Sequence, residues 1–396
     1  MAIPPEQAPT AALLRRLAGA EAVETPMLDA ALLDGLGDVA AAWHAGLAPR
    51  PQDHLAAMRQ AVEGNAEAAV AAGLPPEWVA RWRAAMLGAL ADRAAWLAGR
   101  AAGGFVRRAH GDLHLGNVCL WQGRPVAFDA LEVDEGLATI DVGYDLAFLL
   151  MELDLRAGRA AANRVLNRYV ARTGDVGLCG GLAPFLALRA VVRAHVEARR
   201  GHAAAAARYR DAAMGYLDPP APVVVAVGGL PGVGKSTLAR ALAPGLGPSP
   251  GALVLRSDEI RKRRGGVAPE CRLPQAAYAE TVSRAVLAEL CRGVATAAAA
   301  GHAVIADATF LDAADRAAVA QAAGKAHFVG VWLRAPLNVL EARVAGRSGD
   351  ASDADVAVLR RAASADPGPL EWPDVDAADA PAALAAVRQR LAAWAC

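Results

Sequence analysis

Two short stretches of the sequence combine residue types that could carry out phosphate chemistry. Residues 229–236 read GLPGVGKS and match the pattern G-x-x-x-x-G-K-[ST], directly after an apolar run and before a helical one. In such a loop the glycines let the backbone curl so that its N–H groups point at phosphate oxygens, and the following helix adds its positive end. Residues 110–117 read HGDLHLGN, where an aspartate could meet a hydroxyl proton and an asparagine five residues later could hold a metal ion. Both stretches indicate phosphotransfer.

The first stretch predicts a site for ATP and Mg²⁺. Lys235 can reach the β- and γ-phosphates, and the hydroxyl of Ser236 can ligate Mg²⁺. Asp307 closes the apolar run at 304–306 and fits a Walker B-like carboxylate, which would hold the same ion directly or through water. The predicted nucleotide-binding residues are Gly229, Gly232, Val233, Gly234, Lys235, Ser236 and Thr237.

A pair of arginines in the stretch 340–356 predicts a lid over the bound nucleotide. Arg343 and Arg347 are spaced one helical turn apart, just before the polar, small-residue-rich segment 346–359, which we expect to be mobile. Lid arginines would close over the γ-phosphate, exclude water and spread the charge of the transition state. The alternative is a pair of surface arginines.

The elements after the P-loop resemble small-substrate kinases of the polynucleotide-kinase, zeta-toxin and gluconate-kinase type. The stretch 257–263 reads SDEIRKR and carries a D-x-x-R pattern after the second expected strand. The resemblance implies that Asp258 is the base for the attacking hydroxyl, that Arg261 holds an anion of the acceptor, and that Arg316 contacts substrate or phosphate. The alternatives are a helix cap followed by a solvated basic turn, and an exposed helix arginine.

The region from His110 to Glu152 resembles the aminoglycoside phosphotransferase and choline kinase group, which are relatives of protein kinases. After HGDLHLGN come VAFDALEVD at 126–134 and IDVGYDLAFLL at 140–150. The resemblance implies that Asp112 is the catalytic base, that Asn117 and Asp129 are Mg²⁺ ligands, and that Asp145 bonds the catalytic loop. From about residue 25 to 395 the chain is similar to bacterial bifunctional aminoglycoside phosphotransferase/ATP-binding proteins.

The sequence departs from that group before residue 110. Kinase-like folds hold ATP between a β-rich N-lobe, which carries a strand lysine, and the C-lobe with the catalytic loop. Residues 1–109 contain no lysine, no Gly-rich hairpin and no convincing strand before about residue 104. We therefore expect the N-lobe to be missing, either because the true start lies upstream of Met1 or because the chain keeps only a C-lobe.

The apolar pattern predicts two domains with an α + α/β fold. Residues 1–217 are expected to form a mostly helical kinase-like C-lobe, 218–222 a proline-rich linker, and 223–396 a P-loop kinase domain with a parallel sheet flanked by helices. Expected helices cover 27–46, 52–73, 77–99 and 139–216, with short strands at 104–109 and 117–129. The strands of the second domain are expected at 223–228, 252–257, 302–307 and 327–334.

Composition narrows the class of partner. Lys+Arg and Asp+Glu both number 41, so the formal net charge is zero and gives no pull toward nucleic acid or anionic membranes. The five cysteines show no CxxC spacing, which argues against a disulfide framework or a zinc site. With no signal peptide and no apolar run of about 18 residues, we expect a cytoplasmic protein. A small-molecule acceptor fits best; nucleic acid is not expected, although the run RKRR at 261–264 leaves it open.

Three hypotheses follow. The leading one is a P-loop kinase that transfers the γ-phosphate of ATP to a hydroxyl of a small molecule, with the kinase-like part as a scaffold or acceptor-recognition module. The second is a non-catalytic switch, in which ATP binding changes how the N-terminal helices hold a partner. The third is aminoglycoside-type phosphotransfer by the N-terminal domain, which requires a nucleotide lobe from elsewhere. The sequence leaves the acceptor and the oligomeric state open.

Overall fold

The computed structural model describes residues 20–22, 28–50, 52–131, 135–347 and 350–395. The chain divides into two compact units. Unit 1 comprises residues 1–169 and 178–220, and unit 2 comprises residues 170–177 and 221–396.

Unit 1 is mostly helical. Its helices are α2 (Ala30–Ala45), α3 (His54–Ala71), α4 (Pro76–Asp92), α5 (Ala94–Ala102), α6 (Glu135–Ala138), α7 (Val142–Arg156), α9 (Leu182–Arg199) and α10 (Ala203–Leu217), and α8 (Arg159–Thr173) begins in it. The single helix expected over 77–99 is two helices, because Arg93 leaves helical geometry at φ −106° and ψ 11°. The Arg93 side chain donates hydrogen bonds to the carbonyls of Gly180 and Ala89, which fix this break.

Two small sheets complete unit 1. Strands β1 (Ala20–Ala22), β3 (Val118–Trp121) and β4 (Arg124–Ala127) form an antiparallel sheet in the order β1-β3-β4, and β2 (Val106–Arg108) pairs with β5 (Thr139–Asp141). The expectation of no strand before about residue 104 is therefore wrong. The three residues of β1 read AEA, which carries no strand pattern, and β3 supplies its hydrogen-bonding partner. The helical region expected from residue 139 begins only at Val142, since residues 139–141 form β5.

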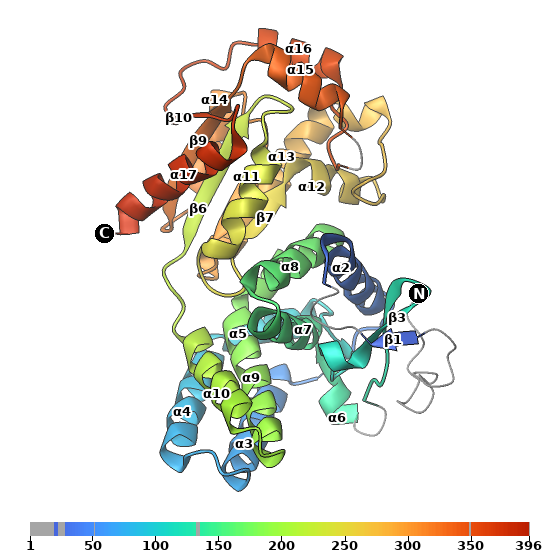
Figure 1. Ribbon diagram of the computed structural model, residues 1–396, viewed down its shortest axis with the longest axis vertical. Coiled ribbons are helices and arrows are strands. Elements are labelled where there is room, and N and C mark those ends of the chain that lie inside the picture. The colour runs from blue at the N-terminus through green and yellow to red at the C-terminus, as the bar shows by residue number, and fades with distance from the viewer. Residues whose placement is uncertain (1–19, 23–27, 51, 132–134, 348–349, 396) are drawn as a thin grey trace. The chain divides into compact units, whose positions relative to one another are not determined.

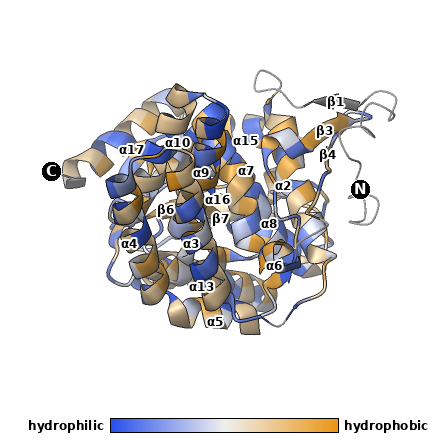
Figure 2. Ribbon diagram, turned by 90° about the horizontal axis from the view of Figure 1, so that it is seen from below, coloured by the Kyte–Doolittle hydropathy of each residue, from blue (hydrophilic) through white to orange (hydrophobic). Residues whose placement is uncertain are grey.

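The core of unit 1 centres on α7. Every residue from Val142 to Leu153 is buried, and α7 packs against α9. Helix α7 is largely hydrophobic in Figure 2, whereas α3 and α4 carry hydrophilic segments beside hydrophobic ones. A helix buried on all sides needs an apolar sequence all round, whereas a surface helix needs only one apolar stripe. The buried position of α7 fixes Asp145, which lies on its first turn.

Unit 2 contains a five-stranded parallel sheet, as the alternating pattern predicted. Its strands are β6 (Val223–Gly229), β7 (Leu253–Arg256), β8 (Val304–Asp307), β9 (His327–Arg334) and β10 (Asp374–Asp376), in the order β10-β9-β6-β8-β7. All seven residues of β6 are buried, as expected for a central strand covered on both faces. Strand β10 was not predicted because it reads DVD, with only one apolar residue.

Helices cover the sheet of unit 2, as Figure 1 shows. They are α11 (Lys235–Leu242), α12 (Ser257–Arg264), α13 (Glu280–Ala299), α14 (Ala313–Ala322), α15 (Leu337–Ala345), α16 (Val356–Ser364) and α17 (Ala380–Ala395), with a 3-10 turn at Gln275–Tyr278. Helix α11 packs against α17 and β6, and α13 packs against α12, α14 and strands β7 and β8. In the described part of the chain, no helix has both the length and the apolar character that crossing a membrane requires.

Candidate functional site

The loop that joins β6 to α11 has the backbone of a phosphate-binding turn. Gly229 and Gly232 adopt φ of 137° and 81°, which residues with a side chain rarely do. A Cβ atom at Gly229 would lie 2.7 Å from the carbonyl oxygen of Leu333, and one at Gly232 would lie 2.7 Å from Cγ2 of Val344. Both positions therefore require glycine. The loop leads directly into α11, which begins at Lys235, so the positive helix end lies at the loop.

Lys235 is folded onto this loop. Its Nζ donates hydrogen bonds to the carbonyl oxygens of Gly229, at 2.9 Å, and Leu230, at 3.0 Å. Burial lowers the pKa of Lys235, and the carboxylates of Asp307 and Asp258 act in the opposite direction. The ammonium group thus bonds the loop that would hold a phosphate, within reach of the charges of two acids.

The side chains of Ser236 and Asp307 are in contact at the carboxyl edge of the sheet. The Ser236 hydroxyl donates a hydrogen bond to Oδ2 of Asp307 at 2.5 Å, which joins the start of α11 to the end of β8. A hydroxyl and a carboxylate oxygen are the ligand types that Mg²⁺ accepts, and Mg²⁺ takes its remaining ligands from phosphate and water. The two side chains predicted as metal ligands of the P-loop therefore fit this ion.

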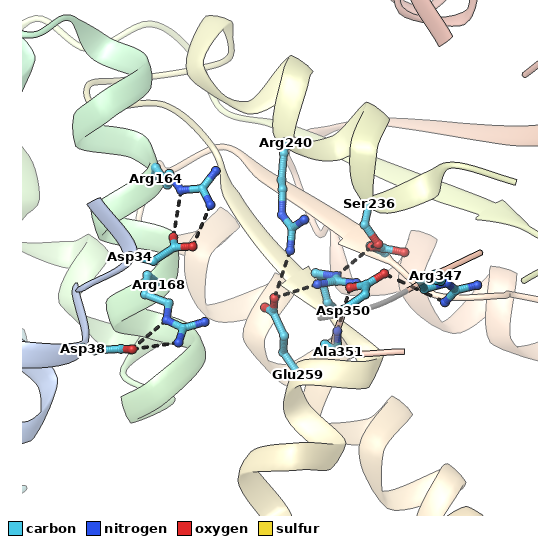
Figure 3. Close-up of polar contacts among 12 residues, drawn as sticks. Asp34, Asp38, Arg164, Arg168, Ser236, Arg240, Glu259, Arg347, Asp350 and Ala351 are labelled. Atoms are coloured by element: carbon cyan, nitrogen blue, oxygen red, sulfur yellow. Dashed lines mark hydrogen bonds and ion pairs between the residues drawn. The ribbon is translucent and has the colours of Figure 1, made fainter. Parts of the chain in front are cut away.

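Arg256 bonds three acidic side chains, one of which is Asp307. The sequence did not predict it as a site residue. Its side chain is 3% exposed at the end of β7. The guanidinium donates to Asp307 at 3.3 Å, Glu259 at 2.9 Å and Asp350 at 2.8 Å. Figure 3 shows this network continuing to Arg240, 3.7 Å from Glu259, and to Arg347 beyond Asp350. The one available signal was its place at a strand end, where parallel α/β sheets bind ligands.

A pocket of about 1070 Å³ collects most of the predicted site residues of unit 2. It is lined by the P-loop from Pro231 to Leu238 and by parts of β8, α12, α15 and α17. Predicted residues on its wall are Gly232, Val233, Gly234, Lys235, Ser236, Thr237, Asp258, Arg261, Asp307, Arg343 and Arg347. Residues on its wall that were not predicted include Arg272, Gln275, Tyr278, Ser352 and Asp353.

Asp258 and Arg261 lie on successive turns of α12 and both face the pocket. Burial raises the pKa of Asp258, while the charges of Arg256 and Lys235 act in the opposite direction. Nη1 of Arg261 donates to the carbonyl of Ala277 at 2.7 Å and to the hydroxyl of Ser283 at 3.2 Å. Asp258 thus combines a place on the pocket wall with a raised proton affinity, as a general base requires.

The two predicted lid arginines do not share a helix. Helix α15 ends at Ala345, so Arg343 is helical and Arg347 lies beyond the helix end. Arg343 donates to the carbonyls of Ala377 at 3.0 Å and Ala378 at 2.7 Å. Arg347 Nη1 is 3.9 Å from Oδ2 of Asp350, and its Nη2 is buried without a hydrogen-bond partner among the described residues.

The segment predicted to be mobile, 346–359, is partly regular. Residues 348 and 349 lie outside the described residues. Asp350 is bonded to Arg256 at 2.8 Å, Asp353 to Lys262 at 2.6 Å, and α16 begins at Val356. The part that the structure describes is thus tied to β7 and α12 by two acidic side chains.

Arg316 is not among the residues that line the pocket. Its side chain is buried, with its guanidinium bonded to the carbonyls of Phe310, Leu311, Pro367 and Pro369 at 2.7–2.9 Å. These contacts clamp the segment after β8 to the segment before β10. In the structure, the guanidinium of this predicted substrate residue is used to hold two segments of unit 2 together.

The basic run at 261–264 is paired within unit 2. Lys262 donates to Asp353, and Arg263 and Arg264 both lie within 2.9 Å of Glu289. The charged side chains of residues 262–264 are therefore each paired with an acidic residue of unit 2.

In unit 1, Asp145 holds the stretch HGDLHLGN as the resemblance implied. Its carboxylate accepts hydrogen bonds from the backbone amides of His110 at 3.1 Å and Gly111 at 2.8 Å, and it contacts Nε2 of His44 at 3.1 Å. Asp145 is fully buried. Its acceptor oxygens therefore satisfy amides that would otherwise be buried without partners.

Asp112 and Asn117 are brought together in the same loop. Nδ2 of Asn117 donates to Oδ2 of Asp112 at 3.0 Å. Burial acts to raise the pKa of Asp112, but the contact with His114, whose Nε2 is 3.4 Å away, and the charges of Arg189 and His110 together hold that pKa below its ordinary value. Asp129 follows β4 with φ of 61° and is exposed. Among the described residues, no group of three or more His, Cys, Asp and Glu side chains is arranged to hold a metal ion.

Comparison with known sequences finds a domain family that matches part of unit 2. Residues 224–365 match a protein-family model described as an AAA domain. Uncharacterized proteins of Mycobacterium tuberculosis H37Rv and of Mycobacterium bovis are each 33% identical to the chain over 291 residues. These alignments cover 70% of this chain and 58% of each relative, so the chain spans 58% of the length of the curated relatives that it matches.

Comparison with solved structures finds kinases. A gluconokinase from Sinorhizobium meliloti 1021 is 22% identical, with 43% of this chain and 95% of that chain covered and a TM-score of 0.30. A glucosamine kinase is 20% identical, with 51% and 60% covered and a TM-score of 0.40. The residues matched by the family model contain the P-loop and most of the parallel sheet, so this part of unit 2 is similar to an AAA domain.

Proposed function

We propose that unit 2 is a kinase that transfers the γ-phosphate of ATP to a hydroxyl group of a small-molecule acceptor. The observation that carries this proposal is the 2.5 Å contact between Ser236 and Asp307, beside Lys235, in a pocket whose wall also carries Asp258. A site that only bound ATP would not need a half-buried carboxylic acid of raised pKa on the same pocket wall.

Each side chain has a chemical role in this proposal. The P-loop amides and Lys235 hold the β- and γ-phosphates, and Arg347 spreads charge over the γ-phosphate oxygens. Ser236 and Asp307 would hold Mg²⁺, which supplies charge neutralisation between the phosphates. Asp258 accepts the proton of the acceptor hydroxyl as its oxygen bonds to the γ-phosphorus and the bond from that phosphorus to the bridging oxygen of ADP breaks.

The acceptor side of the pocket favours a hydroxylated molecule that also carries an anionic group. Arg261 and Arg272 line this side, together with Gln275 and Tyr278. Nη1 of Arg261 bonds the carbonyl of Ala277 and the hydroxyl of Ser283, which hold this guanidinium at the pocket wall. A carboxylate or phosphate is the group that a guanidinium binds best.

A radiolabel assay tests the proposal. The full chain is incubated with γ-labelled ATP, Mg²⁺ and a panel of polyhydroxy acids, amino sugars and nucleosides, and label transfer is followed. The Lys235→Ala variant should lose transfer, while the matched control Lys325→Ala, an exposed lysine outside the pocket, should retain it. Tight ATP binding without transfer to any acceptor would favour the ATP-dependent switch instead.

A second candidate is aminoglycoside-type phosphotransfer by unit 1. It is favoured by the loop geometry around Asp112, which Asn117 and Asp145 support. Loss of transfer in Asp112→Ala with retention in Lys235→Ala would move the activity to unit 1. If transfer follows Lys235 alone, we propose that unit 1 serves as a scaffold or an acceptor-recognition module.

A further inference from the structure

The loop from Cys271 to Tyr278 forms much of the acceptor side of the pocket. Arg272, Leu273, Gln275 and Tyr278 all line the pocket. Before the 3-10 turn at Gln275–Tyr278, the described loop has no helix or strand. The shape of this wall must therefore come from side chains that hold the loop from outside.

One carboxylate oxygen of Asp353 is hydrogen-bonded to two residues of this loop. Oδ2 of Asp353 accepts a hydrogen bond from the hydroxyl of Tyr278 at 2.5 Å and from the amide of Leu273 at 3.0 Å. The same oxygen accepts from Nζ of Lys262 at 2.6 Å. Hydrogen bonds to an ionised group are shorter and stronger than neutral ones, and these three converge on one atom.

Lys262 extends this anchor to the start of the loop. Its side chain is 1% exposed, and its Nζ also donates to the carbonyl of Cys271 at 2.5 Å. A buried lysine is tolerated when its charge is paired, and Asp353 supplies that pairing. Arg261, the preceding residue, bonds the carbonyl of Ala277 and lies 4.8 Å from the ring centroid of Tyr278.

Asp353 belongs to a segment that also contacts the catalytic side of the pocket. Three residues earlier, Asp350 accepts from Arg256, which bonds the metal-site residue Asp307. Ser352 forms a side-chain hydrogen bond with Asp258, the proposed base. Residues 350–353 thus contact Arg256, the proposed base Asp258 and the loop 271–278.

We infer that Asp353 is a positioning residue that sets the acceptor-binding wall of the pocket by holding the loop 271–278 against Lys262. The inference rests on the proposed function, because it assigns that loop to the acceptor. Asp353 acts through Tyr278 and Leu273, while the P-loop keeps its own contacts. Its loss loosens acceptor binding and leaves nucleotide binding intact.

Hydrogen–deuterium exchange of the full chain, with Mg²⁺ and a non-hydrolysable ATP analogue, tests this inference without a known acceptor. In Asp353→Asn, amides of 271–279 should exchange about tenfold faster, because a weakened hydrogen-bond anchor lowers the free energy of local opening. Exchange in 229–238 and the Kd of the analogue should stay within about twofold. The matched control Asp374→Asn, which removes an exposed carboxylate 2.7 Å from Arg334, should change neither.

Unchanged exchange of 271–279 in Asp353→Asn, or an equal rise in 229–238, would overturn the inference. If this variant does not fold, Tyr278→Phe decides, since it removes one donor and leaves the Lys262–Asp353 pair intact. Exchange of 271–279 should still rise, and no rise would reject the role. Failure of the wild-type chain to bind the analogue would refute the proposed function instead.

An acceptor found in the radiolabel assay adds a kinetic readout. Asp353→Asn should raise KM for that acceptor by about tenfold while KM for ATP stays within about twofold, because the variant alters one wall of the pocket only. A purely structural role would lower the amount of active enzyme and leave both KM values unchanged. That result would also reject a positioning role.

Discussion

The hydroxyl of Ser236 lies 2.5 Å from a carboxylate oxygen of Asp307, although 71 residues separate them in the chain. The sheet produces this contact, because β6 and β8 are parallel neighbours and their carboxyl ends meet at one edge. Helix α11 starts where β6 ends, so Ser236 on its first turn reaches the end of β8. The fold thus brings together two oxygen-bearing side chains that are distant in sequence.

The first prediction concerns Asp307. Replacing Asp307 with Asn keeps an oxygen for the Ser236 hydroxyl but removes the charge that a divalent cation needs. The Mg²⁺ concentration for half-maximal phosphotransfer should rise by about 10- to 100-fold. Titration of the activity with Mg²⁺ measures this, and Glu341→Gln, in an exposed pair with Arg360 outside the pocket, serves as the control. An unchanged titration would remove Asp307 from the metal site.

The second prediction concerns the buried charge of Arg256. Three carboxylates, those of Asp307, Glu259 and Asp350, surround its guanidinium. Arg256→Met leaves them without their cation, so unit 2 should lose about 3 kcal/mol of unfolding free energy. Urea denaturation measures this loss. Arg334→Met, which breaks an exposed pair with Asp374, should have little effect. Equal stability of the two variants would show that the network is dispensable.

The third prediction separates two roles of Arg316. Its guanidinium bonds four backbone carbonyls and its side chain is buried, so Arg316→Met should cost roughly 2–4 kcal/mol of stability. The Kd for ATP, measured at a temperature where the variant is folded, should not change. A large loss of ATP or acceptor affinity with unchanged stability would instead support the substrate role that the sequence resemblance implied.

Local pattern explains what could be predicted from the sequence. The four long strands of unit 2 and the P-loop were predictable because each consists of consecutive residues with a recognisable pattern. Strand β10 was not, because the residues DVD form a strand only when β9 is beside them. The same holds for β1, which pairs with β3 about a hundred residues later.

Long-range contacts explain what could not be predicted. Arg256 reads as an ordinary strand-end arginine until the fold brings Asp350, 94 residues away, to its guanidinium. The loop 271–278 belongs to the pocket because Asp353, 75 residues after Tyr278, holds it there. Arg316 looks like an exposed helix arginine until Pro367 and Pro369 supply two of its acceptors. In each case the deciding partner comes from a distant segment, which spacing along the chain does not reveal.

The last prediction concerns the pH dependence of unit 1. His195 on α9 is 8% exposed, and its Nε2 is 3.0 Å from Oδ1 of Asn65. Nδ1 of His195 is buried and has no hydrogen-bond partner within the described residues. The neutral ring that donates from Nε2 to Asn65 is therefore the form that fits this site, and a second proton would be buried without an acceptor.

Burial lowers the pKa of His195 from 6.5 to about 4, and the nearby charge of Arg199 adds to this effect. Because the folded pKa lies below the unfolded one, the neutral ring contributes its full stability above about pH 6.5. That stability is lost as the pH falls toward 4, since the unfolded chain binds the proton more readily. The loss between pH 7 and pH 4.5 should be about 2–3 kcal/mol.

Urea denaturation of the wild type and of His195→Gln at both pH values measures this contribution. Gln can still donate to Asn65 but does not titrate, so the variant should lose less stability between the two pH values than the wild type. His54 and His110 also have lowered pKa values caused first by burial, and they contribute the same sign in both proteins. Their contribution cancels in the difference. An identical pH dependence of the two proteins would mean that His195 accepts its proton without cost in the folded state.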